Sequence, residues 1–194
     1  DAGSVAALCN LGVCYERGEG EERDVAQAAS LYRRAAERED AAAQCNLGYL
    51  YESGEGVEQN WQEAVRWYQA AADQGYARAQ CNLGVCWEFG HGVEKDPAKA
   101  ADLYRQAAEG GDRVAACNLG YLYETGVCVP QSWPDAVKWY RQAVEEDYPR
   151  AQYNLAWCYE HGKGVARDLK RARELYQAAA QQDYDGAQEA ADRL

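Results

Sequence analysis

Three kinds of side chain that could take part in chemistry or binding recur through this chain at intervals of 36 residues. Cysteines form one column (Cys9, Cys45, Cys81 and Cys117), and asparagines directly follow them and continue once more (Asn10, Asn46, Asn82, Asn118 and Asn154). Glutamates form a third column (Glu16, Glu52, Glu88, Glu124 and Glu160). The glutamates offer an acidic stripe for Lys or Arg, or acceptors for the N–H groups of the loop that follows. Because they track the repeat itself, the structural interpretation is favoured.

The cysteines are predicted to be free thiols. Equivalent positions on stacked helices lie about 8–10 Å apart or more, whereas a disulfide needs Cα atoms within about 7 Å. Small buried thiols are typical of a reducing compartment, which favours the cytoplasm without establishing it. Cys128 differs from the others, because it replaces the second glycine of a loop and is expected to be exposed.

The sequence predicts no catalytic residue, metal site or cofactor. Of the two histidines, His91 lies in a Gly-His-Gly loop and is expected to be solvated. Cys158 and His161 lie one helical turn apart, and two such ligands do not make a zinc site. No ordered Ser/His/Asp set, phosphate-binding loop or zincin motif occurs. The Gly-x-Gly segments follow no strand and precede no phosphate-binding lysine, so they are interpreted as turns.

Each 36-residue unit reads as an antiparallel helix pair. In the unit from Ala41 to Gln74, apolar residues at helical spacing end at Gly54, and Asn60 then starts a second helix as its N-cap. The other units place a capping residue at the same position (Asp24, Asp96, Ser132 and Asp168). Fixed periods of this length indicate a stacked repeat array. We therefore expect an all-α, right-handed α-solenoid of about eleven helices.

The expected domain is a single solenoid over residues 1–194. Its repeats run over about 1–36, 37–72, 73–108, 109–144 and 145–180, with a C-terminal capping helix at 181–194. The chain begins without methionine, and Asp1-Ala2-Gly3 is in phase with the turn at residues 73–75. This favours a segment of a longer protein or one that has lost its leader. Without a further capping helix, the first helix predicts weak self-association.

Several columns of residues that recur every 36 positions are expected to have a packing role. Glycines in the middle of the first helices (Gly12, Gly48, Gly84 and Gly120) predict a close approach of the second helix, with Ala28, Ala64, Ala100, Ala136 and Ala172 facing them. Tyrosines (Tyr32, Tyr68, Tyr104, Tyr140 and Tyr176) are expected to fill the seam between units with satisfied hydroxyls. A 72-residue alternation overlies this period, since Trp61 and Trp67 recur as Trp133 and Trp139.

Charge excludes some partners. The formal net charge is −12, which disfavours nucleic acid and anionic membrane surfaces and suits a basic partner, although it also simply aids solubility. No apolar run approaches the length of a membrane-spanning helix, so no membrane insertion is expected.

The Asn-Leu-Gly motif, the Gly-x-Gly-Val loop and the capped second helix together resemble the Sel1-like repeat (SLR) family, a tetratricopeptide-like α-solenoid. The resemblance covers essentially the whole chain in five copies. It implies a bacterial-type scaffold or adaptor for protein binding. Some cysteine-rich relatives join the two helices of a unit by a disulfide. This chain departs from that plan, because every cysteine except Cys128 lies in a first helix.

The resemblance also implies where a ligand would lie. In tetratricopeptide folds, the position of the asparagine column faces a concave groove and bonds the main chain of a peptide; the alternative, that these amides satisfy the helix stack, stays open. The predicted peptide-binding groove comprises Asn46, Tyr49, Asn82, Phe89, Asn118, Tyr121, Asn154 and Trp157. The predicted function is a non-catalytic interaction scaffold. The alternatives are an assembly module that stacks end to end and, less favoured, a hydrolase-like activity.

Overall fold

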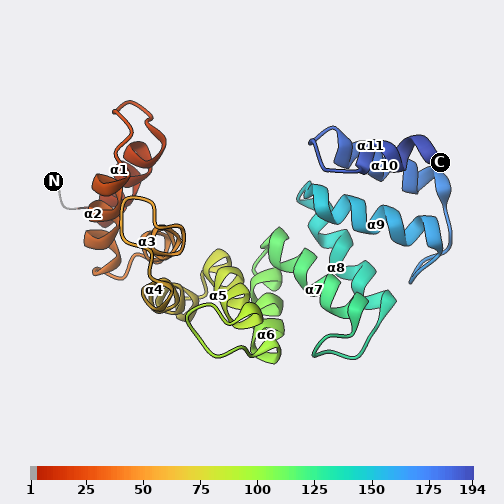
Figure 1. Cartoon of the computed structure of the whole chain (residues 1–194), viewed down its shortest axis with the longest axis horizontal. Helices are drawn as coiled ribbons and strands as arrows, with labels where there is room; N and C mark the ends of the chain where they lie inside the picture. Colours follow the sequence, from red (N-terminus) through yellow and green to blue (C-terminus); the bar gives the residue numbers. More distant parts are fainter. Residues whose placement is uncertain (1–3) are drawn as a thin grey trace. The chain divides into compact units, whose positions relative to one another are not determined.

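The computed structural model describes residues 4–194, and these described residues form eleven α-helices and no strand (Figure 1). First helices of the repeats are α1 (Val5–Arg17), α3 (Ala41–Ser53), α5 (Ala77–Phe89), α7 (Arg113–Thr125) and α9 (Pro149–His161). Second helices are α2 (Val25–Ala36), α4 (Trp61–Asp73), α6 (Pro97–Glu109), α8 (Trp133–Glu145) and α10 (Leu169–Ala180), and α11 (Ala187–Arg193) closes the series. The all-α class and the eleven helices expected from the sequence are confirmed.

The chain divides into two compact units, the first ending at Leu103 and the second covering Tyr104–Leu194, and the boundary falls within α6. Within the first unit, α1 packs on α2, α3 packs on α4, and each second helix packs on the next first helix. Within the second unit, the same holds for α7 with α8 and for α9 with α10, and α11 packs on α10. The single domain over 1–194 stays a prediction, and the turn expected at residues 1–3 lies outside the described part.

Side-chain caps fix where the second helices begin. Asp24, Asn60 and Asp168 each accept a hydrogen bond from the backbone N–H three residues later. Ser132 accepts the corresponding bond in α8, and Asp96 accepts two from the first turn of α6. All five predicted caps are therefore present. The first helices end at glycines in the left-handed conformation, where a side chain would be strained (Gly18, Gly54, Gly90, Gly126 and Gly162).

The core of each repeat is built around one tyrosine of the second helix. Tyr68 is fully buried, and a Cβ added at Gly48 would lie 2.7 Å from its ring and 3.2 Å from the Ala64 carbonyl oxygen. Gly12 and Gly120 meet Tyr32 and Tyr140 in the same way. The close helix crossing predicted from the glycine column is confirmed, and the tyrosine ring occupies the space that the missing side chain leaves.

In three of the inter-helix loops, a glycine allows the loop to lie against the preceding repeat. A Cβ added at Gly56 would lie 2.6 Å from the Val25 carbonyl oxygen, and one at Gly92 would lie 2.5 Å from that of Trp61. Gly164 lies equally close to Trp133. The loops therefore pack on the N-terminal turns of the preceding second helices. Cys128 stands at the equivalent position with a positive φ of 59°, and its side chain is exposed as expected.

No helix in the part of the chain that the structure describes is both long enough and apolar enough to cross a membrane.

Candidate functional site

The predicted groove asparagines connect neighbouring first helices within each unit. In α3 and α7, Asn46 Oδ1 accepts a bond from Arg78 (2.8 Å) and Asn118 Oδ1 accepts one from Arg150 (3.1 Å). In α5 and α9, the amide nitrogens of Asn82 and Asn154 point to cysteine sulfurs of the previous repeat, at 3.9 and 3.8 Å. The 72-residue alternation thus extends to this column, and each amide has a partner within the stack. A role in binding a ligand main chain stays a prediction.

The aromatic residues of the predicted groove are the apolar part of this surface. Tyr49, Phe89 and Tyr121 are 42%, 58% and 43% exposed, so they stand among the few large apolar side chains open to solvent. Trp157 is half-buried. The first unit contributes Tyr49 from α3 and Phe89 from α5, and the second contributes Tyr121 from α7 and Trp157 from α9. Each unit therefore carries its own pair of aromatic side chains on consecutive first helices.

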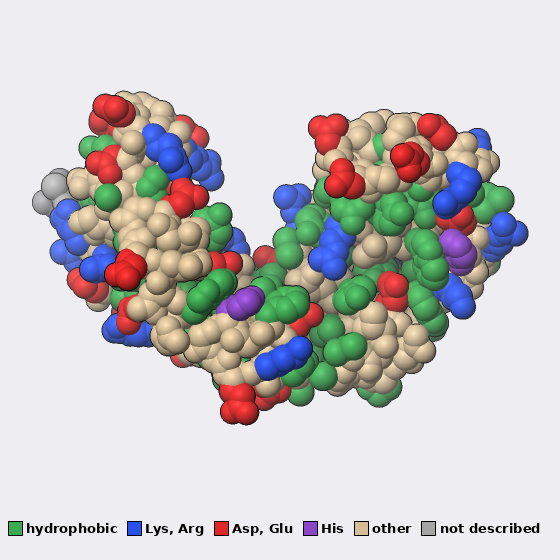
Figure 2. All heavy atoms as spheres, viewed as in Figure 1, with side chains coloured by type: hydrophobic (Ala, Val, Ile, Leu, Met, Phe, Trp, Pro, Cys, Tyr) green, Lys and Arg blue, Asp and Glu red, His purple; other side chains and the backbone are tan. Residues whose placement is uncertain are grey.

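Aromatic stacks extend these pairs, and the histidines belong to them. His91 stacks on Trp61 with ring centroids 4.4 Å apart and lies 5.9 Å from Phe89. In the second unit, His161 stacks on Trp157 at 4.3 Å, and Trp157 stacks on Trp133 at 5.6 Å. Figure 2 shows both histidine side chains against hydrophobic ones. The sequence interpretation of His91 as merely solvated missed this stack, although the recurrence of Trp61 as Trp133 pointed to a shared role.

The glutamate column serves the core rather than the surface. The hydroxyls of Tyr32, Tyr68, Tyr140 and Tyr176 donate to Glu16, Glu52, Glu124 and Glu160, at 2.5, 2.6, 2.5 and 2.8 Å. Burial of each ring, followed by this bond to a carboxylate, raises the pKa of the tyrosine far above its usual range. The structural role favoured from the sequence is confirmed, with a tyrosine hydroxyl as partner in place of the expected loop N–H groups.

The cysteines offer little nucleophilic chemistry. All eight cysteines lie in the described part of the chain and are free thiols, most of them buried. Burial raises the pKa of Cys86, Cys117 and Cys158 to about 12 and that of Cys9 to about 11. A thiol with such a pKa stays protonated at neutral pH and is a poor nucleophile. Residues 4–194 also contain no group of three or more His, Cys, Asp or Glu arranged to hold a metal ion.

The arrangement is that of a helix-pair repeat scaffold with aromatic side chains on its surface. Five consecutive segments match the Sel1 repeat, over residues 5–40, 41–76, 77–112, 113–148 and 149–184. The chain belongs to the Sel1 repeat family. Proteins of this family are generally scaffolds for protein–protein interaction. The matched segments begin about four residues later than the repeat boundaries expected from the sequence.

Solved structures agree with this assignment. The chain is 36% identical to a Sel1 repeat protein from Oxalobacter formigenes, with a TM-score of 0.86 over 96% of this chain and 73% of that one. It is 35% identical to c5321, a protective antigen of uropathogenic Escherichia coli, with a TM-score of 0.85 over 95% of this chain and 39% of that one. The chain thus spans well under half of that antigen.

A more distant likeness is to the immunity protein Pa5087 from Pseudomonas aeruginosa, at 25% identity and a TM-score of 0.63, over 96% of this chain and 67% of that one. A comparison with curated proteins gives no match.

Proposed function

We propose that this chain is a non-catalytic interaction scaffold that binds a peptide or an element of a partner protein on its first helices. The observation that carries the proposal is the exposure of Phe89, Tyr49 and Tyr121 on helices whose other faces are fixed by packing. Exposed aromatic side chains on a rigid scaffold are typical anchors of protein interfaces. Their ring area is large, and little conformational entropy is lost when they are buried.

The neighbourhood of these rings supports a ligand of mixed character. The Arg150 guanidinium lies 5.9 Å from the centre of the Tyr121 ring and also donates to Asn118. Main-chain groups of a bound peptide would find amide and guanidinium partners beside an apolar contact. The residues proposed for binding are the Asn46, Tyr49, Asn82 and Phe89 set in the first unit, and the Asn118, Tyr121, Asn154 and Trp157 set in the second.

The charge of the chain indicates a partner of opposite sign. With a formal net charge of −12, long-range attraction favours a ligand that carries Lys or Arg, and it speeds the encounter at low salt. The same charge repels the phosphate backbone of nucleic acid. Affinity for a basic partner should therefore fall as ionic strength rises, while the contribution of the aromatic contacts remains.

The test compares aromatic variants with a matched surface control. Partners captured from the native host are identified by mass spectrometry, and their affinities are measured by calorimetry for Phe89→Ala, Tyr121→Ala and Leu169→Ala. Leu169 lies on a second helix and is 39% exposed, so it controls for loss of exposed apolar area. An anchor residue should cost about 2 kcal/mol, or roughly thirtyfold in affinity. Equal affinities for all three variants would contradict the proposal that the partner binds on the first helices.

A further inference from the structure

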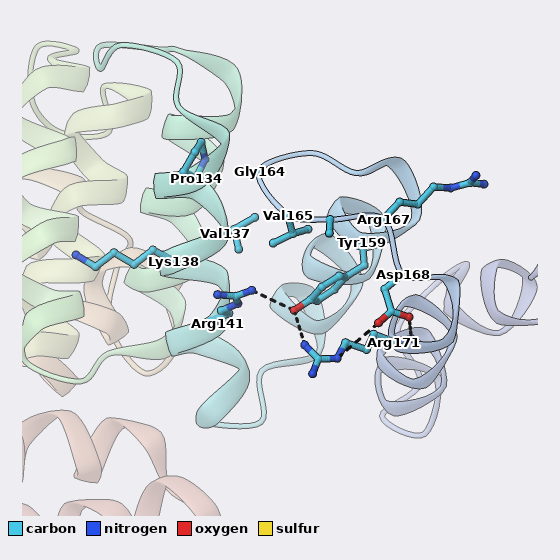
Figure 3. Close-up of a pocket in the computed structure, with 11 residues that line it drawn as sticks. Pro134, Val137, Lys138, Arg141, Tyr159, Gly164, Val165, Arg167, Asp168 and Arg171 are labelled. Carbon is cyan, nitrogen blue, oxygen red and sulfur yellow. Dashed lines mark hydrogen bonds and ion pairs between the residues drawn. The ribbon is translucent and has the colours of Figure 1, made fainter.

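A cavity of about 660 Å³ opens in the second unit between α8, the loop after α9 and the start of α10. Its volume lies within the range of about 300–1,000 Å³ that small-molecule sites occupy. Pro134, Val137 and Val165 line its apolar end (Figure 3). A second cavity of about 300 Å³ shares Arg141, Tyr159 and Arg171 with the first and adds Leu155 and Leu175, together with the carboxylate of Glu174.

Two guanidinium groups converge on one phenol oxygen where the cavities meet. Arg141 of α8 donates to the Tyr159 hydroxyl oxygen at 3.1 Å, and Arg171 of α10 donates to the same oxygen at 3.2 Å. Figure 3 shows both side chains pointing toward Tyr159, whereas Lys138 and Arg167 point away. The Tyr159 hydroxyl hydrogen has no acceptor among the residues that the structure describes. The site therefore holds two cations and a spare donor.

The charges at this point are incompletely balanced. Arg171 Nε lies 3.8 Å from Asp168 Oδ2, while Arg141 forms no ion pair with a carboxylate of the described chain. Burial alone would raise the pKa of Tyr159, but the hydrogen bonds and charges of the two arginines outweigh it and lower that pKa. The pKa values of the core tyrosines are raised instead. A phenol whose anionic form is favoured reports a positive local potential, although the whole chain is acidic.

The equivalent place in the first unit shows that the fold does not require these charges. There, Arg33 donates to the Tyr51 hydroxyl, as Arg141 does to Tyr159. The surrounding cavity of about 460 Å³ is lined by Glu58 and Glu63, and Glu63 stands at the repeat position of Arg171. One arginine on the tyrosine is thus shared by both places. The second arginine, and the positive potential that comes with it, are particular to the second unit.

We propose that Arg141, Tyr159 and Arg171 form a binding site for a carboxylate that is flanked by an apolar side chain. The two guanidiniums supply charge-assisted hydrogen bonds to the carboxylate oxygens, and the Tyr159 hydroxyl donates a further bond. Val137 and Val165 receive the neighbouring apolar group. The ligand is a C-terminal residue of a peptide or an Asp or Glu side chain beside an apolar residue. This site goes beyond the proposed function, because it uses none of the residues proposed for binding there, such as Tyr121 and Trp157.

The test uses small probes and the whole chain. N-acetyl-leucine presents a terminal carboxylate beside an apolar side chain, N-acetyl-aspartyl-leucinamide presents a side-chain carboxylate, and N-acetyl-leucinamide is the uncharged control. Titrations are followed by the backbone amide resonances of residues 164–171. We expect at least one carboxylate probe to shift them saturably, and the one that binds identifies the carboxylate source. Binding by the uncharged amide with equal affinity, or by phenyl phosphate but neither carboxylate, would overturn the proposal.

Variants assign the binding to the two arginines. Arg171→Gln should weaken carboxylate binding by about tenfold, the effect of losing one charge-assisted bond. Arg33→Gln, the matched change beside Tyr51, should leave the affinity within about twofold. Because Arg171 is exposed, its variant should keep the melting temperature of the parent, and Arg141→Gln supplies an independent second measurement. Unchanged affinity in both Arg141→Gln and Arg171→Gln would refute the site. Neither result tests the proposed binding of a partner protein by Tyr49, Phe89 and Tyr121, since no partner protein is present in these titrations.

Discussion

At the scale of single residues, a hydrogen bond from a buried tyrosine to the glutamate sixteen positions earlier recurs through the repeats. Tyr68 is fully buried, so its hydroxyl would be costly to leave unpaired, and Glu52 accepts its hydrogen bond at 2.6 Å. The glutamate in turn lies two residues before Gly54, the glycine that ends α3. The pair therefore links the end of a first helix to the middle of the second helix.

Removing one such hydroxyl should weaken the fold measurably. Tyr68→Phe keeps the ring that fills the space beside Gly48 but leaves the Glu52 carboxylate without this donor. A hydrogen bond to a charged group contributes about 1.5–3 kcal/mol, so urea unfolding should show a loss of that order. Tyr49→Phe is the control, because that side chain is 42% exposed, and its change should stay within about 0.5 kcal/mol. Equal losses in both variants would contradict a specific role for the pair.

Buried thiols are expected to make the folded state less stable as the pH rises into the alkaline range. Burial raises the pKa of Cys86, Cys117 and Cys158 from the ordinary 9.0 to about 12, so the unfolded chain loses these protons first as pH rises. Their contribution is complete below pH 9 and is lost as pH rises from 9 toward 12. The buried tyrosines act in the same direction, because their pKa values are also raised.

We therefore expect the melting temperature to fall between about pH 9 and pH 10.5, as thiols ionise in the unfolded state near their ordinary pKa. Circular dichroism at several pH values measures the fall. Cys117→Ala should make it shallower by removing one of the ionisable groups, while Cys128→Ser, at an exposed position, should leave it unchanged. A melting temperature that stays constant to pH 10.5 would show that buried thiols and tyrosines do not govern stability.

At the scale of elements, loop glycines determine how one repeat lies on the previous one. Gly20 and Gly56 hold the same loop position in consecutive repeats, with φ values of 80° and 70°. A Cβ at Gly56 would collide with the backbone of Val25, whereas nothing lies within 4 Å of one at Gly20. The two positions therefore share the conformational demand and differ only in the contact.

This difference gives a matched pair of substitutions. Both Gly20→Ala and Gly56→Ala introduce left-handed strain of roughly 1–2 kcal/mol. Gly56→Ala must also displace the loop from the first turn of α2, at a further cost of about 1–3 kcal/mol. Chemical denaturation should therefore rank Gly56→Ala clearly below Gly20→Ala. If the two variants were equally stable, strain alone would explain the glycine and the loop contact would contribute nothing.

What the sequence predicted at this scale follows from the range of each interaction. Helix bounds, the caps at Asp24 and Asn60 and the glycine stops are local, so spacing alone revealed them. The Gly48 column predicted a close crossing because a mid-helix glycine needs a packing reason. The stack of His91 on Trp61 and the bond from Arg141 to Tyr159 join residues of different repeats. Their positions depend on how far one repeat turns relative to the next, which residue spacing does not specify.

At the scale of the whole molecule, stability is expected to be distributed along the chain rather than concentrated in one core. Within each unit, helices pack on their neighbours in chain order, and side-chain bonds such as that from Arg78 to Asn46 reach only to the next repeat. In such an array, stability is approximately a sum of repeat terms and nearest-neighbour interface terms. A local defect should therefore open its own surroundings first.

Hydrogen exchange tests this expectation with one substitution. Tyr32→Phe removes the bond from α2 to Glu16 in α1, so exchange of backbone amides should accelerate most in α1, α2 and α3. Amides of α9 and α10 belong to the other compact unit and share no side-chain contact with Tyr32, so their exchange should change by less than about twofold. Tyr176→Phe is the reciprocal variant and should reverse the pattern, because its hydroxyl joins α10 to Glu160 of α9. Uniform acceleration over all helices in both variants would mean that the chain opens as one cooperative body, and the nearest-neighbour description would then be wrong for this protein.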